Sequence, residues 1–577
     1  MRERRENAEA GASDETVRPP SRGRRRLAAA VTLSLPFLLF LVVEAGLRLG
    51  GFGHTHPLFV PHRQAPQYLQ TNPNVIRRFL ADERSVPKLW IRPVPFARDK
   101  APETLRVVVQ GGSTAAGYPY GYGASPAGLL QQRLQRTFPE RRVEVVTTAV
   151  SAVNSYTLLD FADEIVAVEP DAVVVYAGHN EYLGLLGVGS SFSAGRRRPL
   201  VLAFLASKDV RILQLGRRGL AALNAEPATP EPDRRHLMAR VVAEDRIALG
   251  SPLYHRGLAQ YEANLSALLA RYRRAGVPVF VGTLASNERG QPPFISGHAP
   301  GVDTAAWRRH FDAGLAALAA GRPAAARDAF DDALAVSDLH ADTHFARGRA
   351  LDALGRHAEA RDAYLAAKDR DELRFRAPEE VNAILRRVAG EQGATVVEVQ
   401  RALVAAAEDG AIGQDLMLEH LHPNVDGYFE LADAYYEALH TAGIGGSWEH
   451  PVDRATARRE MPLTAVDVLY GLHRARSLTA GWPFRDGGTE YRPPRPRNEV
   501  EELAQGLWRG RLPWPDAMRH LLDHHRAEGE VEAAAKVAAL LADAFPHRAA
   551  DQRTAAELLR RAGRPDAEVY RRRAVGR

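Results

Sequence analysis

Five short apolar runs recur along the chain, and turn-forming residues bound each of them. They are residues 105–109, 143–146, 171–176, 277–282 and 395–399. Such a run is typical of a strand that is buried on both faces of a parallel sheet. Helical patterns lie between the runs, as over residues 125–138, where Ser125 is a suitable N-cap and Pro126 suits the first helical position. Strands that alternate with helices predict an α/β fold with a parallel sheet and helices on both faces.

The long interval between the fourth and fifth runs contains an internal repeat. The segment GRPAAARDAFDDALA, which starts at Gly321, recurs 34 residues later as GRHAEARDAYLAAKD, which starts at Gly355. A 34-residue period with small residues and an aromatic ring at fixed positions resembles the tetratricopeptide repeat. The resemblance implies helical hairpins over residues 303–372, inserted into the α/β domain. It also implies a surface for a protein partner.

The N-terminal region contains a long uncharged segment. Residues 27–43 carry no charge, and a cluster of arginines precedes them. Extended to residue 49, the segment reaches the roughly 20 residues that cross a bilayer, with Glu44 and Arg48 at its far edge. The arginines predict a cytoplasmic N-terminus and place everything after about residue 50 outside. We expect an uncleaved single-pass anchor, and the alternative is a signal peptide with a poor cleavage site at Val43-Glu44-Ala45.

Composition narrows the possible functions. With 577 residues, 45% hydrophobic and 25% charged, the chain is too long for one domain and is globular rather than disordered. Its formal charge of +6 comes from acids and bases that are interspersed, without the basic stripe of a nucleic-acid surface. There is no cysteine, which excludes disulfides, thiol nucleophiles and cysteine-ligated zinc.

Shifts in composition divide the chain into seven expected parts. Prolines, histidines and arginines without periodicity predict that residues 50–100 are a stalk or a wrapping segment. Residues 443–577 are expected to be helical. In that last part Gly529 and Gly563 again stand 34 residues apart, so it is repeat-like. The parts are the cytoplasmic N-terminus 1–26, the anchor 27–49, the stalk or wrapping segment 50–100, the α/β domain 101–302, the repeat insert 303–372, the second part of the α/β domain 373–442, and the helical region 443–577.

Three of the predicted strands are followed by residues that can carry chemistry. Gly111, Gly112 and Ser113 follow the first strand, Asn180 follows the third, and Glu419 and His422 come after the fifth. The carboxyl ends of parallel strands meet at one edge, where α/β proteins bind ligands. A serine, a histidine and a carboxylate together form an activated nucleophile, and an asparagine amide can donate to an oxyanion. His420 is an alternative base, and a His420/His422 metal pair is a further alternative without an evident third ligand.

At these positions the sequence resembles the SGNH (GDSL-like) serine hydrolases. That family has a Gly-Asp-Ser serine, a glycine after strand two, a Gly-x-Asn-Asp loop and an Asp-x-x-His block near the end. The corresponding residues here are Ser113, Ala152, Asn180 and His422. The resemblance covers about residues 105–300 and 373–442. It implies a three-layer α/β/α fold and the hydrolysis or transfer of acyl groups from oxygen, without a metal or an organic cofactor.

The resemblance also implies a role for each residue. Ser113 is the nucleophile, His422 is the base, and Glu419 orients the imidazole. The backbone N–H groups of Ser113 and Ala152 and the side chain of Asn180 form the oxyanion hole. The sequence departs from the family pattern at four positions without losing a catalytic atom type: Gly112 for aspartate, Ala152 for glycine, Glu181 for aspartate and Glu419 for aspartate.

We therefore expect a membrane-anchored, extracytoplasmic serine esterase. It would cleave or transfer O-acyl groups, on envelope carbohydrate or lipid, and bind a protein partner through the repeats. The alternative is a catalytically inactive scaffold for an envelope protein complex. Tyr118, Tyr120 and Tyr122 follow the nucleophile and are expected either to line an acyl or sugar pocket or to form an ordinary aromatic loop.

Overall fold

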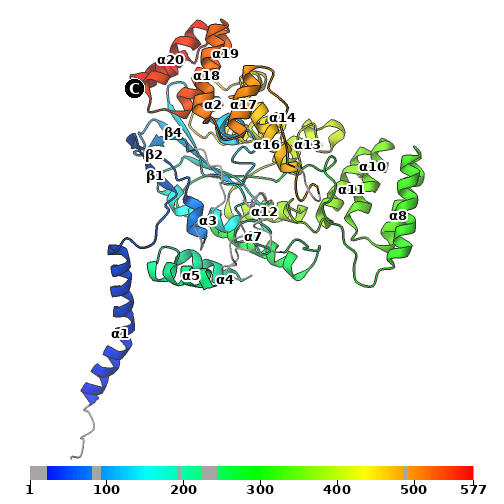
Figure 1. Ribbon diagram of the computed structural model, residues 1–577, viewed down its shortest axis with the longest axis horizontal. Coiled ribbons are helices and arrows are strands. Elements are labelled where there is room, and N and C mark those ends of the chain that lie inside the picture. The colour runs from blue at the N-terminus through cyan, green and yellow to red at the C-terminus, as the bar shows by residue number, and fades with distance from the viewer. Residues whose placement is uncertain (1–21, 81–92, 191–196, 224–243, 486–489, 576–577) are drawn as a thin grey trace, which may run out of the picture. The chain divides into compact units, whose positions relative to one another are not determined.

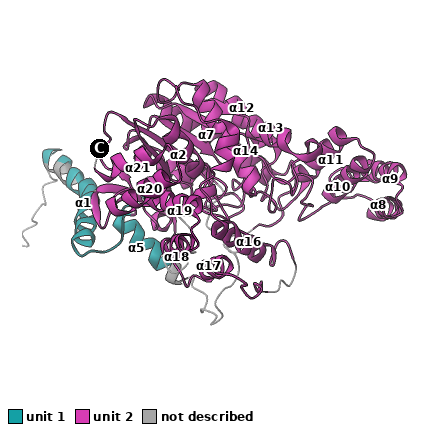
Figure 2. Ribbon diagram, turned by 90° about the horizontal axis from the view of Figure 1, so that it is seen from above, with its two compact units in different colours: residues 1–55, 207–227 teal, residues 56–206, 228–577 magenta. Residues whose placement is uncertain are grey.

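The computed structural model describes residues 22–80, 93–190, 197–223, 244–485 and 490–575. Most of the predicted cytoplasmic N-terminus, residues 1–21, therefore lies outside the described residues. The chain forms two compact units, which Figure 2 colours separately. One unit comprises Met1–Thr55 and Ser207–Pro227, and the other comprises His56–Ala206 and Ala228–Arg577.

A five-stranded parallel sheet forms the centre of the larger unit. Its strands lie in the order β5-β4-β6-β7-β8. Every residue of β4 is buried, as its continuous apolar run predicts. The first and third strands are direct neighbours, and their register pairs Gly111 with Tyr176, so both end at the same edge. The strands are β4 (Thr104–Gly111), β5 (Arg142–Thr147), β6 (Ala172–Tyr176), β7 (Val279–Gly282) and β8 (Thr395–Val397).

Helices cover both faces of the sheet, which confirms the predicted three-layer α/β/α fold (Figure 1). The Ser125 hydroxyl caps the first of these helices by accepting a hydrogen bond from the Gly128 N–H, as the sequence predicts. On one face lie α2 (Pro126–Thr137), α13 (Val399–Ala406) and α14 (Val425–Thr441). On the other lie α3 (Ser155–Val166), α7 (Pro252–Arg274) and α12 (Glu379–Gln392), and α4 (Arg198–Ala206) belongs to the same unit.

The segment before the first central strand packs on the domain instead of forming a free stalk. It contains a small antiparallel sheet of β1 (Phe59–His62), β2 (Ala65–Thr71) and β3 (Phe96–Ala97). Leu58 and Phe79 are buried in the main hydrophobic core. The Arg78 guanidinium lies 2.6 Å from the Asp160 carboxylate of α3 and holds the segment against the helical layer. The described residues between 56 and 100 are therefore a wrapping segment.

Two helical hairpins lie between β7 and β8. Each hairpin places a glycine of its first helix beneath an aromatic ring of its second. A Cβ on Gly314 would lie 2.5 Å from the Phe330 ring, and one on Gly348 would lie 2.6 Å from the Tyr364 ring. The shared contact explains the 34-residue spacing, and the assignment as tetratricopeptide repeats stays a prediction. The helices are α8 (Thr304–Ala319), α9 (Pro323–Val336), α10 (Ala341–Ala353) and α11 (His357–Arg370).

The C-terminal region is helical, as predicted, and most of it has a hydrophobic core of its own. Its last helix contacts the α/β domain, where Arg573 donates to the Gln135 side chain of α2 at 2.5 Å. Its helices are α15 (Arg454–Arg459), α16 (Ala465–Thr479), α17 (Glu499–Trp508), α18 (Trp514–Ala527), α19 (Val531–Ala544), α20 (Ala549–Arg561) and α21 (Ala567–Ala574).

The smaller unit consists of two helices, α1 (Arg22–Leu49) and α5 (Arg211–Leu223). Within α1, Ala29–Leu49 is long and apolar enough to cross a membrane. The predicted N-terminal apolar helix is therefore present.

Candidate active site

Ser113 lies on a tight turn directly after β4. A Cβ on Gly111 would stand 2.2 Å from the Tyr176 carbonyl oxygen, so only glycine lets the two strands end this close together. The Ser113 carbonyl accepts a hydrogen bond from the Tyr118 N–H at 3.0 Å, which closes the turn. The serine itself is only half-buried. The turn therefore presents a hydroxyl to solvent at the edge where α/β sheets bind ligands.

A hydrogen-bonded chain runs from Ser113 through His422 to Glu419. The His422 Nε2 atom lies 2.7 Å from the Ser113 hydroxyl oxygen, and its Nδ1 atom is bonded to Glu419 Oε1. The loop before α14 holds these residues, because Asn424 caps that helix and its N–H donates to Leu416. The sequence separates serine and histidine by 309 residues, and the fold brings them into contact.

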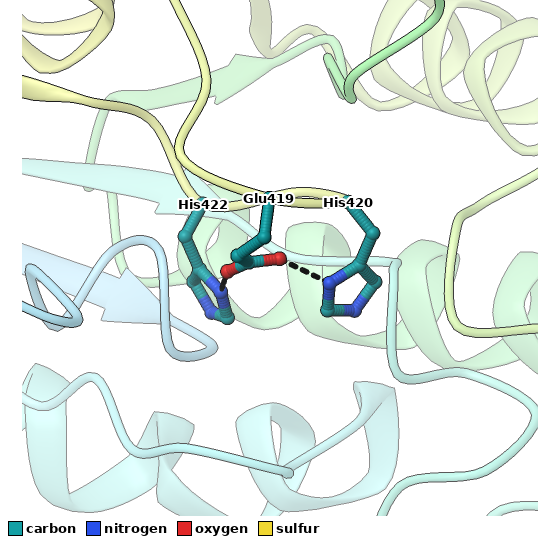
Figure 3. Close-up of side chains that lie close together, drawn as sticks. All are labelled: Glu419, His420 and His422. Carbon is teal, nitrogen blue, oxygen red and sulfur yellow. Dashed lines mark hydrogen bonds and ion pairs between the residues drawn. The ribbon is translucent and has the colours of Figure 1, made fainter. Parts of the chain in front are cut away.

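Glu419 holds two histidines at once, as Figure 3 shows. One carboxylate oxygen is bonded to His422 Nδ1 and the other to His420 Nδ1. Of the two histidines, His422 is the one that contacts Ser113. Ligand atoms of the three residues lie within 4.8 Å of one another, so the group could hold a metal ion by composition. Both ring nitrogens of His422 are already hydrogen-bonded, Nδ1 to Glu419 and Nε2 to Ser113.

Burial and charge set the protonation states of this group. Burial alone would raise the pKa of Glu419, but the two imidazoles beside it hold that pKa well below its usual range. Burial lowers the pKa of His422 below its usual value, although the Glu419 carboxylate acts in the opposite direction. A buried carboxylate beside a neutral imidazole is the arrangement that a general base requires.

The other predicted site residues are Ala152 and Asn180. Ala152 has a φ of +60°, a conformation that favours glycine, which explains why the resembling family has glycine there. A Cβ on Gly112 would lie 3.2 Å from Asn180 Nδ2, so the asparagine amide approaches the nucleophile turn closely. Within the described part of the chain, the Ser113 and Ala152 amides and the Asn180 side chain donate no hydrogen bond to protein. Groups of this kind are the donors that stabilise an oxyanion in acyl transfer.

Part of the chain matches a known protein family. Residues 109–354 match the model of the GDSL-like Lipase/Acylhydrolase family. By this match, residues 109–354 are similar to that family. The match includes Ser113, Ala152 and Asn180 and ends before Glu419 and His422. No curated protein matches the chain.

Several solved structures are similar to this GDSL-like chain. A GDSL-like lipase from Bacteroides thetaiotaomicron is 12% identical, and the match covers 60% of this chain and 93% of that one with a TM-score of 0.26. An acetylxylan esterase from Geobacillus stearothermophilus is 14% identical, with 60% and 97% covered and a TM-score of 0.26. A putative acylhydrolase from Bacteroides fragilis is 10% identical, with 58% and 87% covered and a TM-score of 0.25.

Glu181 braces the Asn180 loop of the GDSL-like domain. Its carboxylate is fully buried and accepts hydrogen bonds from the Ser155 hydroxyl at 2.8 Å, the Ser155 N–H at 3.1 Å and the Gln260 side chain at 2.5 Å. Ser155 begins α3 and Gln260 lies on α7, so the loop is fixed to both helices. Burial raises the pKa of Glu181 to about 7. The sequence shows only an acidic residue beside the asparagine and gives no signal for this network.

The C-terminal region also contributes to the site, which sequence reasoning missed. The Tyr118 ring lies 4.5 Å from the His422 ring, and the Arg474 guanidinium of α16 lies 4.5 Å above the Tyr118 ring. Arg474 also donates to the Pro119 carbonyl at 2.9 Å. Of the three predicted tyrosines, Tyr118 is therefore at the site. Tyr120 is buried against Tyr428, away from it.

An aromatic wall surrounds the second histidine. The His420 ring lies 5.7 Å from Phe294, 5.8 Å from Phe375 and 5.3 Å from Phe484. Phe294 follows β7, Phe375 follows α11 and Phe484 follows α16, so three segments that are distant in the sequence build one wall. No sequence pattern predicts this meeting, because it depends on how the C-terminal region packs.

Proposed function

We propose that this protein is a serine esterase that hydrolyses O-acyl esters, with Ser113 as nucleophile, His422 as general base and Glu419 as the residue that orients the base. The observation that carries the proposal is the continuous hydrogen-bonded chain from the Ser113 hydroxyl through His422 to Glu419. The family of residues 109–354, which contains acylhydrolases, supports the same chemistry.

The reaction follows from the atoms at the site. Ser113 Oγ attacks the ester carbonyl carbon while His422 Nε2 takes its proton, and Glu419 stabilises the resulting imidazolium. The carbonyl oxygen becomes an oxyanion that accepts hydrogen bonds from the Ser113 and Ala152 N–H groups and from Asn180. When the C–O bond breaks, the leaving alkoxide receives the proton from His422. Water then attacks the acyl-enzyme with His422 again as base, which releases the carboxylic acid and restores Ser113.

The proposed setting is the outer side of a membrane. The apolar span of α1 supports anchorage, and the arginines that precede it favour a cytoplasmic N-terminus. Acylated carbohydrate or lipid of the cell envelope is the substrate class that this setting favours. An alcohol in place of water at the second step would make the same site an acyltransferase. The hairpins α8–α11 are the proposed contact for a protein partner.

Reaction with a fluorophosphonate probe tests the proposal. The full-length protein in detergent should be labelled at Ser113, as seen by intact mass and peptide mapping. Ser113→Ala and His422→Ala should abolish labelling, whereas the matched variant His420→Gln should retain it. Asn180→Ala should slow turnover of a short-chain aryl ester by about 10²–10³-fold, the usual effect of one lost oxyanion donor. A folded wild-type protein that neither reacts with the probe nor cleaves the ester would refute the esterase and favour the scaffold.

A further inference from the structure

Helix α5 turns its leucines outward and its polar side chains inward. Leu213, Leu215 and Leu220 are 41%, 45% and 63% exposed. Arg211 is buried, and Gln214 is half-buried. A helix on the surface of a soluble domain has the opposite arrangement, with its apolar stripe facing the core. The exposed face of α5 therefore needs an apolar partner, which the described residues do not supply.

The charged end of α1 holds the start of α5. Both oxygens of the Glu44 carboxylate accept backbone hydrogen bonds from α5, one from the Arg211 N–H and one from the Ile212 N–H, each at 3.0 Å. The Arg48 guanidinium donates to the Asp209 carbonyl at 3.2 Å. The Glu44 carboxylate thus satisfies the first N–H groups of α5, which no helix can satisfy internally. The two charges at the edge of the apolar span are therefore used to fix a second helix.

Two further hydrogen bonds fix the start of α5 to the residues that follow α1. The Gln214 side chain accepts from the His54 N–H at 3.1 Å and donates to the His54 carbonyl at 2.9 Å. His54 follows the end of the apolar span Ala29–Leu49 by a few residues. Helix α5 thus begins beside the point where a membrane-spanning α1 would leave the hydrocarbon.

We propose that α5 lies in the membrane interface beside the outer end of α1, with Leu213, Leu215 and Leu220 among the lipid acyl chains. The proposal rests on the membrane anchorage in the proposed function. A bilayer is the occupant, because α5 shares its unit with α1, whose residues 31–43 are all exposed and lie in its apolar span. Arg217 donates to the Ser207 hydroxyl at 3.2 Å and the Arg218 guanidinium lies 5.0 Å from the Phe52 ring, so both side chains contact the rest of the unit. A helix of this amphipathic kind binds in the plane of the interface.

The absence of cysteine allows a direct test, because any introduced cysteine is the only one. Full-length protein is reconstituted in vesicles of phosphatidylethanolamine and phosphatidylglycerol and spin-labelled at one position. Collision with oxygen, which concentrates in lipid, is compared with collision with a water-soluble nickel chelate. Leu220→Cys and Leu213→Cys should favour oxygen several-fold over the nickel chelate. Arg218→Cys, on the face of the same helix opposite Leu213 and Leu220, should favour nickel, as should Ala305→Cys on the exposed surface of α8.

The position Leu38→Cys, within α1, reports anchorage separately. If Leu38→Cys favours oxygen and Leu220→Cys behaves like Ala305→Cys, the interfacial helix is refuted and the anchor stands. If Leu38→Cys favours nickel while Leu220→Cys favours oxygen, the anchor fails and the lipid contact of α5 is supported by itself. If both favour nickel, both ideas fail. Equal ratios at Arg218→Cys and Leu220→Cys would also refute the proposal, because an interfacial helix must differ between its faces.

Discussion

Replacing Glu181 by glutamine should change the pH dependence of stability in a defined direction. The carboxyl group is fully buried, and burial raises its pKa from the usual 4.5 to about 7. The folded protein therefore holds this proton more tightly than the unfolded chain does. Stability consequently falls as the pH rises from about 4.5 to about 7, and the whole loss is present above pH 7. Each pKa unit corresponds to 1.36 kcal/mol, which makes the loss about 3 kcal/mol.

Glu181→Gln removes the charge and so removes this pH-dependent loss. The new amide must still face the Ser155 N–H and the Gln260 side chain, which costs about 1 kcal/mol at every pH. The free energy of unfolding of Glu181→Gln minus that of the wild type should therefore increase by about 3 kcal/mol between pH 4.5 and 8. The variant should be the less stable protein at acidic pH and the more stable one at pH 8.

Urea unfolding at a series of pH values measures this difference. The chain has several domains that need not unfold together. Unfolding around Glu181 is therefore followed at each urea concentration by hydrogen exchange of peptides from β6 and α3. Glu391→Gln, an exposed glutamate on α12, controls for the loss of one charge. A difference that stays constant from pH 4.5 to pH 8 would show that Glu181 does not change its charge there, and the reasoning from burial would be wrong.

Two further predictions concern the site. Ala152→Gly should raise the free energy of unfolding by up to about 1 kcal/mol, because relief of the left-handed conformation outweighs the added freedom of glycine in the unfolded chain. Probe labelling should keep its rate. A lower free energy of unfolding together with slower labelling would show that the alanine methyl group is needed. The labelling rate should rise with pH through a midpoint below 6.5, because His422 must be neutral to act as base and burial lowers its pKa. Glu419→Gln removes a group that raises that pKa and should move the midpoint to lower pH, whereas Arg474→Gln removes a group that lowers it and should move the midpoint to higher pH. Labelling profiles whose midpoints move in the same direction in both variants would contradict this account.

The sequence predicts the central sheet well because its strands are buried on both faces. Each of the five apolar runs lies within a few residues of a strand, and the cap at Ser125 is where the pattern places it. The segment before β4 is different. Its strands contain Pro61 and Pro66 and lack alternation, so their structure depends on pairing with each other and on ion pairs such as that of Arg78.

The same contrast holds at the site. Ser113 and Asn180 follow neighbouring strands that end at one edge, so the order of the strands is enough to predict that they meet. His422 comes after β8 only beyond α13, and its place is predicted by the resemblance to the family's last block. Arg474 has no such signal, because it looks like an ordinary surface arginine on a helix. Its place above Tyr118 depends on the packing of α16 against a loop more than 350 residues earlier in the chain.

The position of the insert has a consequence for how the chain matures. The partner strands β7 and β8 are separated by residues 283–394, and the cost of closing a loop grows with its length. Helices α8–α11 form from contacts close in sequence, so they can fold early and shorten that loop. During synthesis the nucleophile emerges far ahead of its base. On the proposed mechanism, the Ser113 hydroxyl of a nascent chain has no base until His422 and α14 have left the ribosome. Ester cleavage therefore begins only once almost the whole α/β domain has been made.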